Sequence, residues 1–301
     1  MRYILRFTIV LVCFLTPYVL EAQNAPSIEW QKCYGGTYTD GCQCMVRTED
    51  GGYILCGSTN SHSGDVVGGH LGVYDDAWIV KIDSNGKLEW QKCLGGNFTE
   101  IAYSIIQCFD RGYLVVGLSN SHDGDIVRAI GDTGSTAIPW AAKLDSTGKL
   151  QWEKSLDGIV KPWFTGSAYT VIQTPDSNFI IGGEINGAEE GLINHGMFDA
   201  YIAKLSPSGV LLMQRAYGGD KDERVSSILQ TTDGGYIFSG VTGSKNSGDV
   251  QGSTNSDLLH TWTVKLDQSF NIQWQKMLDG SQYGGDLPKI IHTKNHAFVV
   301  C

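Results

Sequence analysis

Proline, charge and long apolar runs are all scarce in this sequence. The 301 residues include only 7 prolines, and charged residues make up 18%, where about a quarter is usual. Glycine nevertheless contributes 38 residues and aromatics 10%. A disordered chain would be rich in charge and poor in aromatics, and collagen would place glycine at every third residue, so both classes are excluded. The composition is typical of many short strands joined by tight turns.

Basic residues are also few. Lys and Arg total 22 against 32 Asp and Glu, which gives a net charge of -10, and no basic stripe occurs. Nucleic acids and anionic membrane surfaces both attract concentrated positive charge. We therefore expect neither as a partner. The sequence also lacks G-x-S-x-G, H-E-x-x-H and phosphate-loop motifs, so it indicates no common hydrolase or nucleotide site.

The longest apolar run lies at the N-terminus. Phe7 to Leu20 follows Arg2 and Arg6, and Leu20-Glu21-Ala22 offers a cleavage site. A spanning helix needs about 20 apolar residues, which is more than this run supplies, and no second run of that length follows. The sequence therefore predicts a signal peptide over residues 1–22, with the propeller described below in residues 23–301. We expect a secreted, periplasmic or cell-surface protein with no membrane span.

The cysteines form no disulfide framework, because seven follow residue 22 at irregular spacings. Cys42-Gln43-Cys44 has the form of a metal or redox pair, since alternate residues of a strand point to one face. The alternative is that both are small, buried strand residues. Cys33 and Cys93 hold equivalent repeat positions, and we expect these two and Cys56 to be buried and reduced.

A repeat of 61 residues on average is the main feature of the sequence. The motif Glu29-Trp30-Gln31-Lys32 recurs, and the steps from Trp30 to Trp90, Trp152, Met213 and Trp274 are 60, 62, 61 and 61 residues. Each period predicts four strands. Asp-Gly turns suited to hairpins join the first two, and an aromatic residue of the third strand precedes the Trp or Met of the fourth by 12 residues.

Helix-free units of four strands predict an all-β fold, a β-propeller, because such a unit cannot bury both faces alone. We expect four complete blades, over about 40–94, 100–156, 167–217 and 223–278, and a partial fifth over 285–301. Residues 27–34 are expected to form a strand. In one alternative, that strand joins the two strands expected over 285–301 and closes the ring. In the second, the chain is part of a larger ring. We favour the second, because ending in mid-strand leaves an unpaired edge.

One stretch resembles a known blade signature. Ala142 to Trp152 resembles the quinoprotein-type propeller pattern, small-x-Leu-Asp-x-x-Thr-Gly-x-x-x-Trp, and Val80 to Trp90 is similar to it, with Asn85 in place of Thr. The third copy departs from it, with Ser206, Pro207 and Met213. The recurring Gly-Gly and Asp-Gly-Gly-Tyr motifs also resemble those of exported bacterial proteins with tandem repeats of this length. The resemblance implies a propeller and says little of function.

Quinoprotein dehydrogenases carry a quinone, a calcium site and a pair of adjacent cysteines. Here Gln43 separates the closest pair, so we expect no cofactor. The metal content of the polar loops stays open.

The loops after strands two and four are long and share one end of the blades, where binding residues commonly gather. Trp163 and Phe164 lie there in an insertion unique to the third copy, and they are candidates to stack on a sugar or anchor a partner. The alternative is that they cap a gap between blades. His62 and His122 occupy matching places in a repeated Asn/Ser/Asp loop. Its oxygens suit calcium, but turn-forming bonds to their own backbone explain them equally.

Three acids, Asp40, Glu100 and Glu223, begin the first strands in register. They would ring a central channel and raise one another's pKa, or they are solvated or turn-bonded acids. The favoured function is an exported, non-catalytic binding or scaffold propeller whose partner is a protein or a glycan at the long-loop face. The alternative is a polysaccharide hydrolase or lyase that uses these acids. A quinoprotein dehydrogenase is a further, weaker candidate.

Overall fold

The computed structural model describes residues 27–70, 73–126, 136–156, 165–187, 192–252, 258–278, 288–293 and 298–301. The chain divides into two units, Met1–Gln31 and Lys32–Cys301. Of the first unit, residues 27–31 are described, and they form neither helix nor strand. The second unit contains every strand described below.

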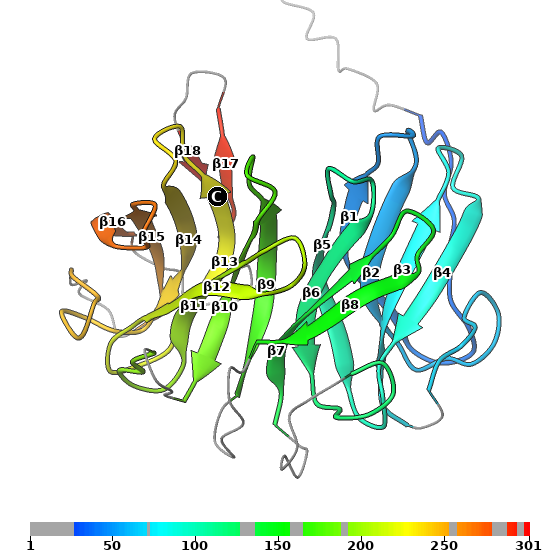
Figure 1. Ribbon diagram of the computed structural model, residues 1–301, viewed down its shortest axis with the longest axis horizontal. Helices are drawn as coiled ribbons and strands as arrows, with labels where there is room; N and C mark the ends of the chain where they lie inside the picture. Colours follow the sequence, from blue (N-terminus) through cyan, green and yellow to red (C-terminus); the bar gives the residue numbers. More distant parts are fainter. Residues whose placement is uncertain are drawn as a thin grey trace, which may run out of the picture. The chain divides into compact units, whose positions relative to one another are not determined.

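Eighteen β-strands and no helix occur in these described residues. Sixteen of the strands form four antiparallel sheets, in each of which four consecutive strands lie side by side in chain order (Figure 1). The sheets are β1 (Asp40–Arg47), β2 (Tyr53–Thr59), β3 (Asp76–Ile82) and β4 (Leu88–Leu94); β5 (Glu100–Gln107), β6 (Tyr113–Ser119), β7 (Ile138–Leu144) and β8 (Leu150–Ser155); β9 (Thr165–Gln173), β10 (Phe179–Asn186), β11 (Asp199–Leu205) and β12 (Leu211–Tyr217); and β13 (Glu223–Gln230), β14 (Tyr236–Thr242), β15 (His260–Leu266) and β16 (Ile272–Leu278).

A two-stranded sheet follows, made of β17 (Ile290–His292) and β18 (Phe298–Val300). The predicted all-β class and the repeated four-stranded blades are therefore confirmed. First strands pack on the preceding blade: β5 lies on β1 and β2, β9 on β5 and β6, and β13 on β9 and β10. β17 contacts β13 in the same manner.

The third strands of the first, second and fourth blades each carry a buried lysine. Lys143 is 3% exposed, and its Nζ lies 2.8 Å from the carboxylate of Asp110 in the turn between strands one and two. Nζ also donates to the carbonyl of Leu144 at 3.0 Å. A buried ammonium needs such partners, because leaving water is costly for a charge. Lys81 with Asp50 and Lys265 with Asp233 repeat the arrangement at 2.9 and 2.8 Å.

Every first strand contains a β-bulge at the same place, after its third residue in β1, β5 and β13. In β1 the register shifts between Cys42 and Cys44. An extra residue reverses the alternation of faces beyond it. Cys44 accordingly packs against the hydrophobic core that the first two blades share, whereas Cys42 is exposed. The expectation that Cys42 and Cys44 share a face is therefore wrong.

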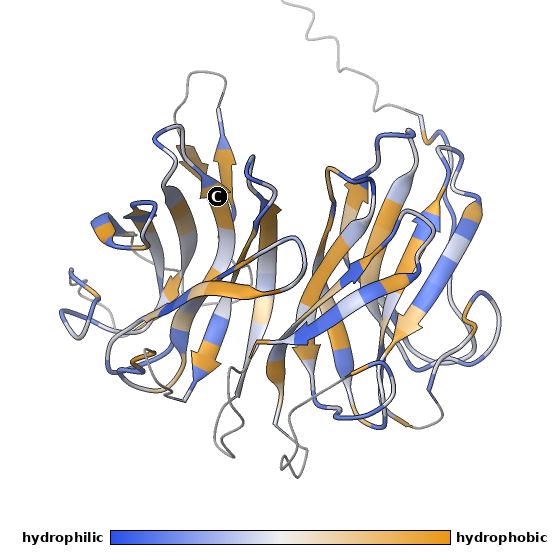
Figure 2. Ribbon diagram, in the orientation of Figure 1, coloured by the Kyte–Doolittle hydropathy of each residue, from blue (hydrophilic) through white to orange (hydrophobic). Residues whose placement is uncertain are grey.

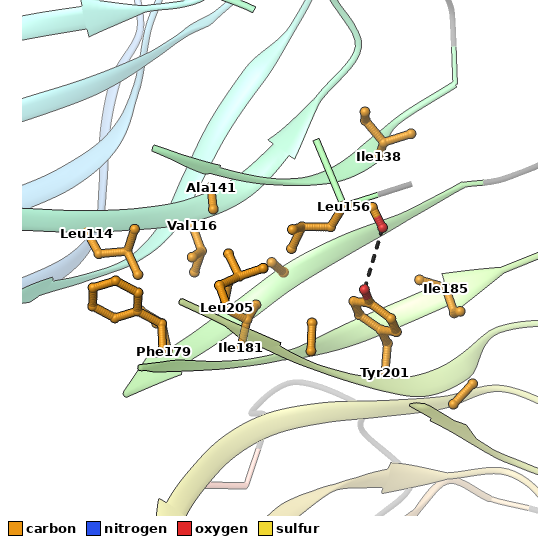
Figure 3. Close-up of a cluster of buried hydrophobic side chains, with 14 of the residues drawn as sticks. Leu114, Val116, Ile138, Ala141, Leu156, Phe179, Ile181, Ile185, Tyr201 and Leu205 are labelled. Atoms are coloured by element: carbon orange, nitrogen blue, oxygen red, sulfur yellow. Dashed lines mark hydrogen bonds between the residues drawn. The ribbon is translucent and has the colours of Figure 1, made fainter. Parts of the chain in front are cut away.

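The core lies between neighbouring blades. Figure 3 shows the cluster between the second and third blades, in which Val116 and Ala141 face Ile181 and Leu205. The hydroxyl of Tyr201 donates to the carbonyl of Leu156 at 3.5 Å there. Third strands are buried throughout, and fourth strands are only partly covered. In Figure 2 much of β4 is accordingly coloured hydrophilic.

Fourth-strand tryptophans cover a glycine turn of the next blade. A Cβ added to Gly148 would lie 2.7 Å from the Trp90 ring, and Gly148 has φ +84°, which glycine adopts without strain. The Trp90 ring also lies 5.6 Å from Tyr113. Trp152 covers Gly209 in the same way. These contacts make the turn glycine and the preceding tryptophan a matched pair.

The third blade departs from this pairing in a compensated manner. Met213 replaces the tryptophan, and Phe270 replaces the glycine in the turn that follows in the fourth blade. Phe270 is fully buried at φ +65°, and its ring lies 5.4 Å from Tyr236. Tyr236 occupies the place of Tyr113 in the repeat. The phenyl ring of Phe270 therefore fills the space that an indole fills at the earlier interfaces.

Two further sequence expectations differ from the structure. Residues 27–34 form no strand, and within the described part of the chain β17 pairs with β18 alone. Cys33, expected to be buried on that strand, is exposed, whereas Cys56 and Cys93 are buried as expected. Trp274 is 47% exposed, because no turn of a following blade lies over it among the described residues.

Candidate functional site

The long connections of the first, second and fourth blades are built on a common frame. Its centre is the carboxylate that begins the first strand. Glu100 Oε1 accepts hydrogen bonds from the Ser119 hydroxyl at 2.7 Å and the Ser121 amide at 3.0 Å. Glu100 Oε2 accepts one from the Gly96 amide at 3.0 Å. The side chain therefore joins the loop after strand two to the loop that enters strand one.

Glu223 and Asp40 repeat this arrangement. The carboxylate of Glu223 accepts from the Thr242 hydroxyl at 2.6 Å and the Gly219 amide at 2.7 Å. The Asp40 carboxylate accepts from the Thr59 hydroxyl at 2.5 Å, and also from Gly36 and Ser61. Glu100 and Glu223 are fully buried and Asp40 is half-buried. The turn-bonded interpretation of these acids accounts for their geometry. Direct contact with a ligand stays a prediction, and the burial of Glu100 and Glu223 argues against it.

Burial alters how these acids titrate. Desolvation raises the pKa of Glu100 and of Glu223, because the charged form has lost water, although the hydrogen bonds oppose it. Desolvation likewise raises the pKa of Asp76 and Asp199. The exposed turn acid Asp50 behaves in the opposite way: its hydrogen bond from Thr48 and its contact with Lys81 lower its pKa to about 2.

These opposite shifts predict how stability depends on pH. A raised pKa means that the folded state binds protons more readily than the unfolded state, so lowering the pH from 7 toward the usual pKa values of 4.5 (Glu) and 3.8 (Asp) should raise the free energy of unfolding. Between pH 3.8 and about 2 it should fall again, because Asp50 binds a proton in the unfolded state and stays ionised in the folded state. Urea unfolding from pH 2 to 8 measures this. A steady fall from pH 7 downward would contradict it.

Two histidines absent from the sequence expectations tie neighbouring blades together. The Nδ1 of His70 lies 3.3 Å from the buried carboxylate of Asp76, and its Nε2 lies 3.8 Å from Asp125 of the next blade. His195 contacts Asp199 and Asp249 at 3.3 and 3.8 Å in the third and fourth blades. The long-loop end is thus held by bonds both within and between blades.

Two positions of this frame carry side chains that differ from blade to blade. One lies two residues before the carboxylate, and its amide donates to the frame serine at 2.9 Å in all three blades. The other directly follows that serine. We call these two residues the presented pair of each blade. They are Tyr38 with His62, Phe98 with His122, and Lys221 with Lys245.

The second presented pair forms part of an aromatic row. The ring of Phe98 lies 6.0 Å from His122 and 5.6 Å from Tyr74. His122 is exposed and Tyr74 is 48% exposed. The row is flanked by polar groups, since the Asn97 amide donates to the Asp123 carboxylate at 2.9 Å. Tyr38, of the first presented pair, is 69% exposed.

Trp163 and Phe164 lie outside the described residues. The sequence places Phe164 two residues before Gly166, as Phe98 stands before Glu100. In the sequence repeat, Phe164 therefore corresponds to Phe98. Tyr38 and Phe98 were missed by sequence reasoning, although an alignment of the repeats on the first-strand acids would have shown them beside His62 and His122.

A polar cluster on β9, β10 and β13 was also missed. Tyr169 donates to Glu184 Oε1 at 2.6 Å, and Arg224 Nε lies 3.2 Å from Glu184 Oε2. The ring of Tyr103 lies 5.1 Å from that of Tyr169. Burial raises the pKa of Glu184 in spite of these partners. Tyr103 and Tyr169 are the bulge residues of their strands, a position that sequence alone does not reveal.

Within the described part of the chain, no group of three or more His, Cys, Asp or Glu side chains is placed to hold a metal ion. No helix there has the length and apolar character needed to cross a membrane. Compared with known proteins, the sequence matches no family model and no curated protein.

Proposed function

We propose that this protein is an exported, non-catalytic β-propeller that binds a glycan or a protein at its long-loop end. One observation carries the proposal. The frame of carboxylate, serine and paired glycines is the same in three blades, yet its presented pairs change from Tyr38 and His62 to Lys221 and Lys245. A rigid scaffold with varied exposed side chains is the arrangement that binding surfaces use.

The presented side chains indicate the chemistry of the ligand. Tyr38, Phe98 and the adjacent Tyr74 offer flat apolar faces, and Asn97 with Asp123 offers hydrogen-bond donors and acceptors beside them. Aromatic faces combined with planar polar groups suit a sugar ring, and exposed aromatic anchors equally suit a protein partner. Lys221 and Lys245 favour acidic groups on the part of the ligand that lies at the fourth blade.

Export rests on the signal-like segment over 1–22, and the resemblance to quinoprotein-type blades supports the propeller architecture. It does not extend to the dehydrogenase reaction, because the bulge places Cys42 and Cys44 on different faces of β1. The three acids proposed for a polysaccharide-active enzyme all use their carboxylates to accept hydrogen bonds within the frame. Turnover of a bound glycan, measured by release of reducing ends, would nevertheless indicate that alternative.

A binding screen tests the proposal. Replacing Phe98 with Ala should weaken binding of a glycan or protein hit by about fivefold or more, which is about 1 kcal/mol, because an aromatic anchor is lost. Isothermal titration gives the affinity. Phe109, which is 64% exposed in a short turn at the opposite end of the blades, provides the matched control. Equal losses in Phe98→Ala and Phe109→Ala would place binding elsewhere.

The insertion of the third blade gives a separate prediction. Trp163→Ala should change the free energy of unfolding by no more than about 0.5 kcal/mol, as for other surface residues. It should weaken binding of the same ligand by about 1 kcal/mol or more, and Phe164→Ala should do the same. Denaturation and titration on the same variants measure both effects. A loss of several kcal/mol of stability would show instead that Trp163 packs between blades.

A further inference from the structure

Two cysteines of the first blade stand directly opposite each other. Arg47 pairs with Tyr53 at the turn, and counting back along β1 and β2 brings Cys44 opposite Cys56. Both side chains face the second blade: Cys56 lies 3.7 Å from the carbonyl of Ala102, and Cys44 packs against the same core. The register thus places the two side chains next to each other across the sheet.

The repeat itself does not require sulfur at these positions. The corresponding pairs in the other blades are Ser104 with Val116, Thr170 with Gly182, and Ser227 with Ser239. A small or polar residue therefore satisfies the packing of the sheet. The facing cysteines are a special feature of the first blade.

The surroundings make the two thiols unequal. The hydrogen bond from Cys56 lowers the pKa of Cys44 to about 6, and the Ile105 amide and the charge of Lys289 contribute in the same direction against the effect of burial. Burial raises the pKa of Cys56 well above its usual range. Cys44 is half-buried and Cys56 is 1% exposed. One member is thus a reachable thiolate, and the other is a protected thiol beside it.

We propose that Cys44 and Cys56 are a redox-active dithiol that reduces small disulfides and closes into a cross-strand disulfide. The Cys44 thiolate attacks one sulfur of a disulfide RSSR, which releases RS⁻ and forms a mixed disulfide. Cys56 Sγ then attacks Cys44 Sγ and expels the second RS⁻, which takes the proton of Cys56. RSSR is thereby reduced to RS⁻ and RSH, the RS⁻ being protonated by solvent according to its own pKa, and the two protein sulfurs are oxidised to one disulfide.

Peptide mapping tests the proposal in a Cys33→Ser/Cys42→Ser background. Trypsin then leaves Cys44 as the sole cysteine of the peptide 33–47 and Cys56 as the sole cysteine of 48–81. The reduced, folded chain is treated with oxidised glutathione and quenched with acid. Its remaining thiols are then blocked with N-ethylmaleimide in denaturant before digestion with trypsin. We expect the two peptides to be joined. Persistent glutathione on Cys44, or an unmodified Cys44, would overturn the proposal.

Kinetics and matched variants sharpen the test. The rate of reaction with Ellman's reagent should be half-maximal near pH 6, the pKa of Cys44. Cys56→Ser should stop the reaction at the mixed disulfide, and Cys44→Ser should abolish the fast phase. Cys44→Ser installs the residue type that Ser104 and Ser227 already supply in equivalent strands, so it should fold. A fast phase that survives Cys44→Ser would assign the reactivity to another thiol and overturn the proposal.

Discussion

Replacing Phe270 with glycine is expected to lower the free energy of unfolding by about 3 kcal/mol. Loss of a buried phenyl ring costs about 3–5 kcal/mol, and relief of the left-handed backbone at φ +65° returns part of this. Met213→Trp alone should also destabilise, by about 1–3 kcal/mol, because the indole would overlap the phenyl ring. Denaturant unfolding measures both variants.

The double variant is the decisive one. Met213→Trp with Phe270→Gly rebuilds the arrangement of Trp90 on Gly148, so its stability should return to within about 1 kcal/mol of the original chain. The two substitutions should therefore show a coupling of several kcal/mol in a double-mutant cycle. Additive losses would show that Phe270 does not fill the place of a tryptophan.

Removing the carboxylate of Glu100 is expected to have an effect of similar size. Glu100→Ala leaves the Gly96 amide and the Ser119 hydroxyl without their acceptor in a buried place, and the Ser121 amide keeps only its 3.1 Å bond to Ser119 Oγ. Each buried donor left unpaired costs about 1–3 kcal/mol, so the total loss should be about 3 kcal/mol or more. Hydrogen exchange at Gly96 and Ser121 should accelerate at the same time.

Asp40→Ala is the matched control, because Asp40 makes equivalent bonds and is only half-buried. Water replaces the carboxylate there, and the expected loss is about 1 kcal/mol. Equal losses in the two variants would contradict the burial-based account of the frame. A small effect at both positions would contradict a structural role for these acids altogether.

The strand pattern was readable from the sequence, because its determinants are local. Glycine at Asp-Gly turns such as Asp50-Gly51 marks where a hairpin reverses, and the fixed interval from Trp78 to Trp90 marks the third and fourth strands. These features repeat, so each copy corroborates the others. Four blades followed from them without any knowledge of tertiary contacts.

What the sequence concealed depends on partners distant along the chain. The bulge after Cys42 left a misleading C-x-C motif, and the true facing pair, Cys44 and Cys56, is visible only once the register about the turn is known. The burial of Glu100 depends on two loops that meet in space. Residues 27–34 do not form the expected strand, because a fourth-strand motif needs a third strand beside it. Among the described residues, β17 and β18 pair only with each other.

The matched pairs of turn and fourth strand also limit how such a chain can be rearranged by recombination. Each pair straddles a blade boundary: Trp152 belongs to the second blade and Gly209 to the third. The first two interfaces carry the same pair, so a duplicated second blade would fit behind the first or before the third. The fourth blade is not interchangeable in this way, since Phe270 would collide with any indole placed before it. The third and fourth blades must therefore be inherited together, as one module of about 120 residues. The interface inside this module pairs Met213 with Phe270, whereas the earlier interfaces pair a tryptophan with a glycine.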